Sequence, residues 1–242
     1  MNFEDYLSKI EFRFIQPNMS IPRFYTKLSE FLDGFFNMPL ELHNVRFPIN
    51  DSNIKEELIN LKKIPRMSTL TIAAIINYGV SQISPNEAFI NVGVWNGFTL
   101  IAGMLNNQDK KCVGIDNFSK FGGPKHNFLE RFNKYKSDNH LFFEMDYQDY
   151  FSTIHEGKIG FYLYDGDHSY KHQLNGLQKA EPYLSDNALI LIDDTNWDEP
   201  RKATLDFISH SSNQYNIIFD CKTNDTMHPT YWNGIMILRR IV

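Results

Sequence analysis

The chain has 242 residues, a length at which one α/β domain with modest additions can bury a full core and two independent domains would be cramped. Its 24 basic and 29 acidic residues include no basic block, which disfavours nucleic acid and anionic membranes as partners. The two cysteines form no CxxC pair, and the N-terminus lacks the pattern of a signal peptide, so we expect a cytoplasmic protein.

Residues 1–85 carry apolar side chains at helical spacing, interrupted by prolines, and this pattern predicts an N-terminal helical extension. Within it, Ser68 is expected to cap a helix that runs from about Leu70 to Gln82. Residues 86–242 form the main domain in this interpretation, and nothing between the two parts has the composition of a linker.

Short apolar runs that alternate with polar helical segments follow residue 85. Five such runs joined by crossovers predict a parallel sheet buried on both faces: 88–94, 111–115, 141–144, 160–164 and 188–192. The runs 216–220 and 231–238 are separated by a loop too short for a crossover helix, so they predict an antiparallel hairpin. The predicted fold class is α/β, with a doubly wound, Rossmann-like sheet of seven strands that is mostly parallel.

A glycine turn follows the first strand of this sheet. In an open parallel sheet, ligands bind beyond the carboxyl ends of the strands, where the strand order reverses. Gly93 and Gly97 would let the backbone approach a ligand, and the helix expected from about Phe98 would present amides to a carboxylate or phosphate. By itself the turn is equally compatible with a tight connection that binds nothing.

Two aspartates follow the second and third strands. Asp116 lies nineteen residues after Gly97, where a carboxylate would reach the hydroxyls of a ribose; its alternative role is to cap a turn. Asp146 could accept a hydrogen bond from an adenine amino group, or could be a solvated loop residue.

The densest polar clusters follow the fourth and fifth strands. Asp165 and Asp167 stand at one strand end, and Asp193 and Asp194 stand at the other. Four carboxylates would repel one another without a compensating cation, so Asp165 with Asp193 or Asp194 predicts a site for a hard divalent ion. The alternative is that these aspartates cap helices and loop amides.

His168 lies in the same cluster and could take a proton from an acceptor hydroxyl, because its acidic neighbours should raise its basicity. His172 is a weaker candidate for this role. The other histidines that we considered are expected at the surface: His126, His140 and His155.

Four segments together resemble the class I S-adenosylmethionine-dependent methyltransferases: FINVGVWNG at 89–97, GID at 114–116, YDGDHSY at 164–170 and LIDDT at 191–195. The likeness is greatest to the branch with macrolide-sugar and catechol-type O-methyltransferases, and it covers about residues 66–240. The family fold also has an antiparallel seventh strand. The resemblance implies roles for the following residues: Gly93 and Gly97 at the methionine moiety, Asp116 at the ribose, Asp146 near the adenine, Asp165 beside the cofactor, Asp165, Asp193 and Asp194 on magnesium, and His168 as the base.

The predicted function is therefore metal-assisted O-methylation of a small-molecule acceptor, with S-adenosylmethionine as cofactor. One alternative is an NAD-dependent oxidoreductase, since Asp116 would also suit a nicotinamide dinucleotide, although Trp95 stands where the dinucleotide fingerprint has its second glycine. Another is a catalytically idle relative, which Asn91 favours because the family often has an acidic residue there. The extension could shape the acceptor pocket or join two chains in a homodimer.

Overall fold

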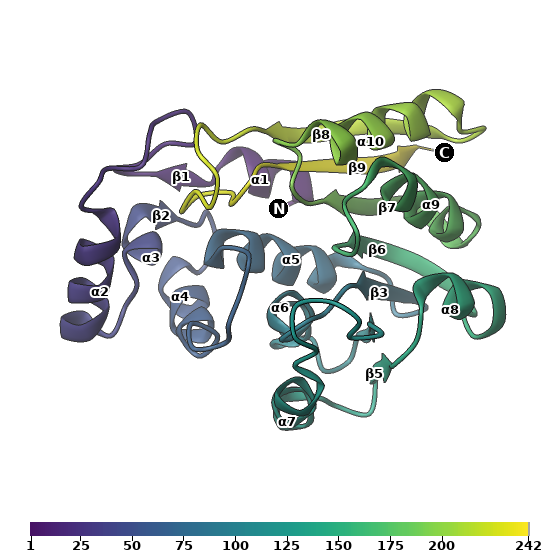
Figure 1. Ribbon diagram of the computed structural model, residues 1–242, viewed down its shortest axis with the longest axis horizontal. Helices are drawn as coiled ribbons and strands as arrows, with labels where there is room; N and C mark the ends of the chain where they lie inside the picture. The colour runs from purple at the N-terminus through teal and green to yellow at the C-terminus, as the bar shows by residue number, and fades with distance from the viewer. Residues whose placement is uncertain (242) are drawn as a thin grey trace.

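The computed structural model describes residues 1–241, and its centre is a seven-stranded sheet in the order β5-β4-β3-β6-β7-β9-β8. In Figure 1 the strands follow one another from β8 at the top to β5 near the bottom. The strand bounds are β3 Glu87–Val92, β4 Lys111–Ile115, β5 His140–Phe143, β6 Lys158–Tyr164, β7 Leu184–Ile192, β8 Gln214–Cys221 and β9 Ile235–Ile241. The predicted seven-stranded, mostly parallel sheet is confirmed.

The strand order reverses between β3 and β6. From β3 the chain passes outward through β4 to β5, and it then returns to add β6 and β7 on the other side of β3. The last strand, β9, pairs antiparallel with both β7 and β8, which confirms the predicted hairpin. The carboxyl ends of β3 and β6 thus flank the position at which an open sheet of this kind binds its ligands.

Two apolar clusters cover the two faces of the sheet because successive side chains on a strand point to opposite faces. Phe89 and Phe161 pack in one cluster, and their chain neighbours Ile90 and Tyr162 pack in the other. The first cluster includes residues of α5 Leu70–Gln82, α6 Phe98–Met104 and α7 Lys125–Tyr135; the second includes residues of α8 Tyr147–Thr153, α9 Tyr170–Ala180 and α10 Asp198–His210. A short 3-10 helix, Glu181–Tyr183, links α9 to β7.

The N-terminal extension is mostly helical, with α1 Phe3–Ser8, α2 Tyr25–Phe36, α3 Leu40–Asn44 and α4 Asp51–Ile59. It also contains a two-stranded antiparallel sheet, β1 Glu11–Phe12 with β2 Val45–Arg46, which is too short to show a periodic pattern in the sequence. Phe3 packs edge-on against Phe161 of β6, so the core of the extension is continuous with one face of the central sheet.

Helix α2 lies at the left edge of Figure 1, away from the sheet, and none of its residues is buried. Phe31, Phe35 and Phe36 are largely exposed on it. A homodimer through the extension stays a prediction. No helix within residues 1–241 is both long enough and apolar enough to cross a membrane.

The cap of α5 is Thr69, one residue later than the predicted Ser68. Thr69 Oγ1 accepts a hydrogen bond from Ile72 N at 3.2 Å and donates to Thr230 O at 2.8 Å, whereas Ser68 Oγ is buried without a partner in the described residues. The backbone angles at the helix start decide between two adjacent hydroxyl residues, and the sequence does not specify them.

We expect Thr69→Ala to lower the free energy of unfolding by about 1 to 2 kcal/mol, because it removes the cap and the bond to Thr230. Ser68→Ala is the matched control and should have little effect. Urea unfolding of the two variants checks this, and equal losses would contradict the assignment of the cap.

Two histidines that the sequence analysis expected at the surface are buried. His140 accepts from Ser137 N through Nδ1, and its Nε2 lies 3.2 Å from Asn107 O. His155 packs among the rings of Tyr150, Phe151 and Tyr183, with Nδ1 at 3.0 Å from Tyr150 Oη. Both are enclosed by contacts with residues that periodicity alone does not bring together. The side chain of His126 is 87% exposed, as predicted.

Burial, and then the nearby charge of Lys111, lower the pKa of His155 to about 4. The unfolded chain therefore binds more protons than the folded chain between about pH 6.5 and 4, and stability should fall as the pH falls through this window. We expect wild type to lose about 1 to 2 kcal/mol relative to His155→Phe between pH 7 and pH 5. Denaturant unfolding at both pH values measures this difference, and a constant offset would refute it.

Candidate functional site

A pocket of about 500 Å³ opens at the carboxyl ends of β3 to β7, at the point where the strand order reverses. It collects most of the residues that the sequence analysis proposed for a site: Gly93, Asp116, Asp146, Asp165, His168, Asp193 and Asp194. Gly97 is not among the residues that line it. Residues from five strand ends thus meet in one cavity, as the topology predicts.

The two glycines of the turn are required by packing. Gly93 has φ +81°, and a Cβ there would lie 1.9 Å from the carbonyl oxygen of Asp165. Gly97 has φ +90°, and a Cβ there would lie 2.8 Å from the ring of Phe128, outside the pocket wall. Gly93 therefore lets the end of β3 approach the end of β6, and Gly97 lets the turn approach α7.

Asp116 joins the end of β4 to the glycine turn. Its Oδ2 accepts hydrogen bonds from Val94 N at 2.9 Å and Trp95 N at 2.8 Å, and its Oδ1 accepts from Phe118 N at 2.7 Å. The turn-capping alternative is therefore realised in the structure. The carboxylate also faces the pocket, so its contact with a ribose stays a prediction.

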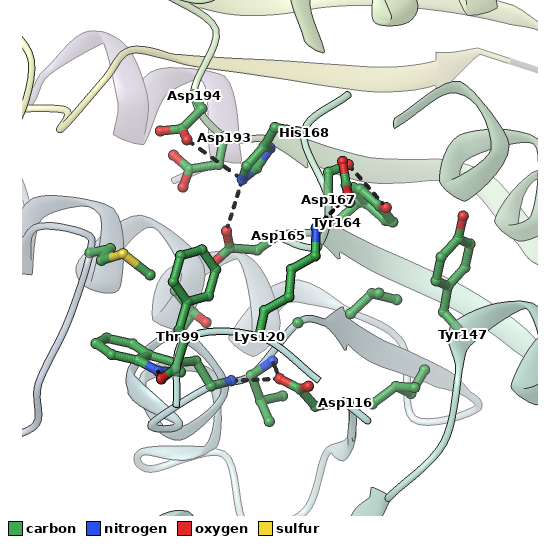
Figure 2. A pocket seen from close by; sticks show the side chains of 18 of the residues that line it. Thr99, Asp116, Lys120, Tyr147, Tyr164, Asp165, Asp167, His168, Asp193 and Asp194 are labelled. Atoms are coloured by element: carbon green, nitrogen blue, oxygen red, sulfur yellow. Dashed lines mark hydrogen bonds and ion pairs between the residues drawn. The ribbon is translucent and has the colours of Figure 1, made fainter. Parts of the chain in front are cut away.

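Asp146 is the N-cap of α8, where its Oδ1 accepts from Gln148 N at 2.8 Å. It lines the pocket between Met145 and Tyr147. Figure 2 shows Tyr147 on the opposite side of the cavity from the acidic cluster. This part of the pocket, between Met145 and Tyr147, suits an apolar ring system with a polar edge. The contact of Asp146 with adenine stays a prediction.

The acidic cluster forms around His168 (Figure 2). His168 Nε2 lies 3.5 Å from both Asp165 Oδ1 and Asp194 Oδ2, while Asn233 Nδ2 donates to Asp194 Oδ1 at 2.8 Å. Asp193 Oδ1 and His168 Nδ1 are buried and have no hydrogen-bond partner in the described part of the chain. Two carboxylates from two strand ends thus share one imidazole, and Asp193 adds a third carboxylate without an ion pair of its own.

Burial raises the pKa of all three carboxyl groups, and repulsion by neighbouring carboxylates adds to this at Asp193 and Asp165. Burial raises the pKa of Asp193 well above its ordinary value, and the charges of Asp165 and Asp194 raise it further. Burial also raises the pKa of Asp165 and of Asp194, against the opposing charge of His168. Burial alone would lower the pKa of His168, but the hydrogen bond and charge of Asp165, followed by the charges of Asp194 and Asp193, raise it to about 9.

A protonated His168 is therefore the counter-ion of the cluster in this structure. As an imidazolium it has no free lone pair, so it cannot act as the predicted base while it fulfils this role. It can accept a proton only if another cation balances the carboxylates.

The segment at 90–195 matches the model of a family described as a methyltransferase domain. This match supports the S-adenosylmethionine-dependent methyltransferase that the sequence resemblance implied. The match does not support the alternative of an NAD-dependent oxidoreductase. A search of curated proteins finds no match.

Solved structures share the fold of this methyltransferase. The cofactor-bound Rv0187 protein from MTB superposes with a TM-score of 0.59 at 11% identity, covering 91% of this chain and 98% of that one. A putative O-methyltransferase from Klebsiella pneumoniae gives 0.56 at 10% identity, covering 90% and 98%. A putative rRNA methylase from Clostridium thermocellum gives 0.53 at 12% identity, covering 71% and 97%.

Asn91 lies beneath the glycine turn of the methyltransferase. It is fully buried, its Oδ1 accepts from Thr99 Oγ1 at 2.8 Å, and its Nδ2 lies 3.3 Å from Val92 O and 3.4 Å from Gly93 O. It does not line the pocket. Its amide can both donate and accept here, whereas an ionised carboxylate could only accept.

The acidic cluster fits a hard cation in charge and donor type. Three carboxylates provide oxygen ligands, and the buried Oδ1 of Asp193 has no partner. The conformation is not ready to bind one, however, because no group of three or more His, Cys, Asp or Glu side chains within residues 1–241 is arranged to hold a metal ion. His168 stands between Asp165 and Asp194, so an ion would replace its imidazolium as counter-charge.

Two polar residues of the pocket wall were not predicted from the sequence as parts of a site. Lys120 Nζ bonds to Asp167, and Arg66 enters from the N-terminal extension. Lys120 follows the end of β4 by a few residues, so the strand end is a signal that could have identified it. Arg66 precedes the sheet, and no local signal marks it.

Proposed function

We propose that the protein transfers the methyl group of S-adenosylmethionine to a hydroxyl oxygen of a small molecule, with the help of a divalent cation such as Mg²⁺. The observation that carries the proposal is the gathering of Asp165, Asp193 and Asp194 around His168 in the wall of the pocket formed by the glycine turn. A carboxylate cluster of this kind suits an acceptor oxygen that must be oriented and deprotonated.

Asp165, Asp193 and Asp194 would hold the cation, which when bound supplies Lewis acidity that lowers the pKa of the acceptor hydroxyl. With the carboxylates balanced in this way, His168 would lose its extra proton to solvent and leave its ion pairs, and the neutral imidazole could then take the hydroxyl proton. The acceptor oxygen then forms a bond to the methyl carbon, the bond between this carbon and sulfur breaks, and S-adenosylhomocysteine leaves. Trp197, which is 45% exposed beside His168, provides an apolar surface for the acceptor.

Charge supports a small acceptor over RNA. The pocket wall carries six aspartates, and the chain has a formal net charge of −5. RNA binding depends strongly on contacts between cationic side chains and phosphates, and the carboxylates of an acidic cavity repel phosphates. The volume of about 500 Å³ lies in the range of small-molecule sites.

The test is methyl transfer from labelled S-adenosylmethionine to a panel of catechols, phenols and sugars, with Mg²⁺ or with EDTA, and with ribosomal RNA in parallel. Labelled methyl ether that forms with Mg²⁺ and is lost with EDTA is the expected result. Undiminished transfer in EDTA would refute the role of the metal. Methylation of RNA alone would refute the class of acceptor. Cofactor binding without transfer to any substrate would favour the catalytically idle alternative.

A further inference from the structure

Several cationic side chains line the pocket, and they differ in where the carboxylate that neutralises each one lies. Lys120 is bonded to Asp167, and His168 lies between Asp165 and Asp194, so both are neutralised by aspartates of the pocket wall itself. Arg66 also lines the pocket, but its carboxylate partner, Glu41, does not.

The guanidinium of Arg66 is held from behind by the N-terminal extension. Nη2 bonds to Oε1 of Glu41 in α3, and Nη1 donates to the carbonyl of Lys62 at 2.9 Å. Glu41 is itself fixed, because it is 6% exposed and its Oε2 accepts from Leu70 N at 3.2 Å. A guanidinium has five N–H donors, and these two bonds leave three for a ligand.

Arg66 lies at the glycine-turn end of the pocket. Its guanidinium carbon is 5.3 Å from the ring centroid of Phe98, the first residue of α6 after the turn. Asp116, at the end of β4, accepts hydrogen bonds from Val94 N and Trp95 N of the same turn. The amino-acid part of the cofactor is expected beside the glycines, and this is the part that Arg66 would face.

The cofactor has one anionic group, the carboxylate of its methionine moiety, while its amino and sulfonium groups are positive. A carboxylate that enters a wall with six aspartates needs a cation within hydrogen-bond distance. We propose that Arg66 binds this carboxylate, and that Glu41 positions the guanidinium for it. The inference rests on the cofactor of the family and not on the proposed acceptor, so it stands or falls separately from O-methylation.

Isothermal titration with two ligands tests the proposal: S-adenosylmethionine and its decarboxylated form, which keeps the amine and the sulfonium. Arg66→Met should weaken binding of S-adenosylmethionine by about 10- to 100-fold and change binding of the decarboxylated ligand by less than about threefold. Because this variant leaves Glu41 buried without its partner, the double variant Glu41→Gln/Arg66→Met is measured as well and should show the same discrimination with the fold intact.

Arg131→Met is the matched control. Arg131 Nη1 donates to Asn96 Oδ1 of the glycine turn at 2.7 Å, but Arg131 does not line the pocket, so its loss should not distinguish the two ligands. Glu41→Gln should lower the affinity for S-adenosylmethionine less than Arg66→Met does. Equal weakening of both ligands by Arg66→Met and the double variant, or no weakening at all, would overturn the proposal. So would a wild-type protein that binds both ligands equally well.

Discussion

Asp193→Asn is expected to lower the rate of methyl transfer by about 100-fold or more and, at the same time, to raise the stability of the protein. The rate should fall because the proposed cation loses a charged ligand. Stability should rise by about 1 to 3 kcal/mol because the variant removes a buried carboxylate that has an unpartnered oxygen and whose pKa is raised by burial and by two neighbouring carboxylates.

The expected loss of rate comes with a gain of stability, whereas replacing an aspartate with a purely structural role would lower the stability. Initial rates with saturating cofactor and thermal unfolding measure them on the same preparation. Asp186→Asn is the matched control, because Asp186 is an exposed residue of β7, the strand that Asp193 directly follows, and its replacement should change neither quantity. A destabilised Asp193→Asn with normal activity would contradict the assignment.

Gly93→Ala is expected to cost at least about 3 kcal/mol of unfolding free energy and to abolish cofactor binding. Part of the loss is the positive φ of +81°, which an L-residue adopts only with strain. The larger part is the collision of the new Cβ with the carbonyl oxygen of Asp165, a backbone atom that cannot move without displacing the end of β6.

Gly122→Ala separates these two contributions. Gly122 has nearly the same φ, +77°, and nothing lies within 4 Å of the position of its Cβ. Its replacement should cost only about 1 to 2 kcal/mol, the backbone strain alone. Urea unfolding of both variants gives the difference, and similar losses would show that the contact between β3 and β6 is not tight in solution.

The N-cap of α5 depends on a contact that local sequence does not encode. The periodicity of residues 70–82 predicts the helix correctly, but the cap moves from Ser68 to Thr69 because the contact with Thr230 comes from the far end of the chain. His140 and His155 were wrongly expected at the surface for a related reason: Asn107 reaches His140, and Tyr183 packs against His155, from distant parts of the chain.

The sequence by itself determined the sheet and the rim of the site. The apolar runs mark the strands, and the glycines and aspartates that follow them fall at one edge because parallel strands all end there. Only the tertiary structure decided how these residues bond. Asp116 binds the amides of Val94 and Trp95, and Glu41 bonds to Arg66 from behind the pocket wall. Both contacts join segments more than twenty residues apart, and local patterns carry no information about which distant partner a buried polar group will meet.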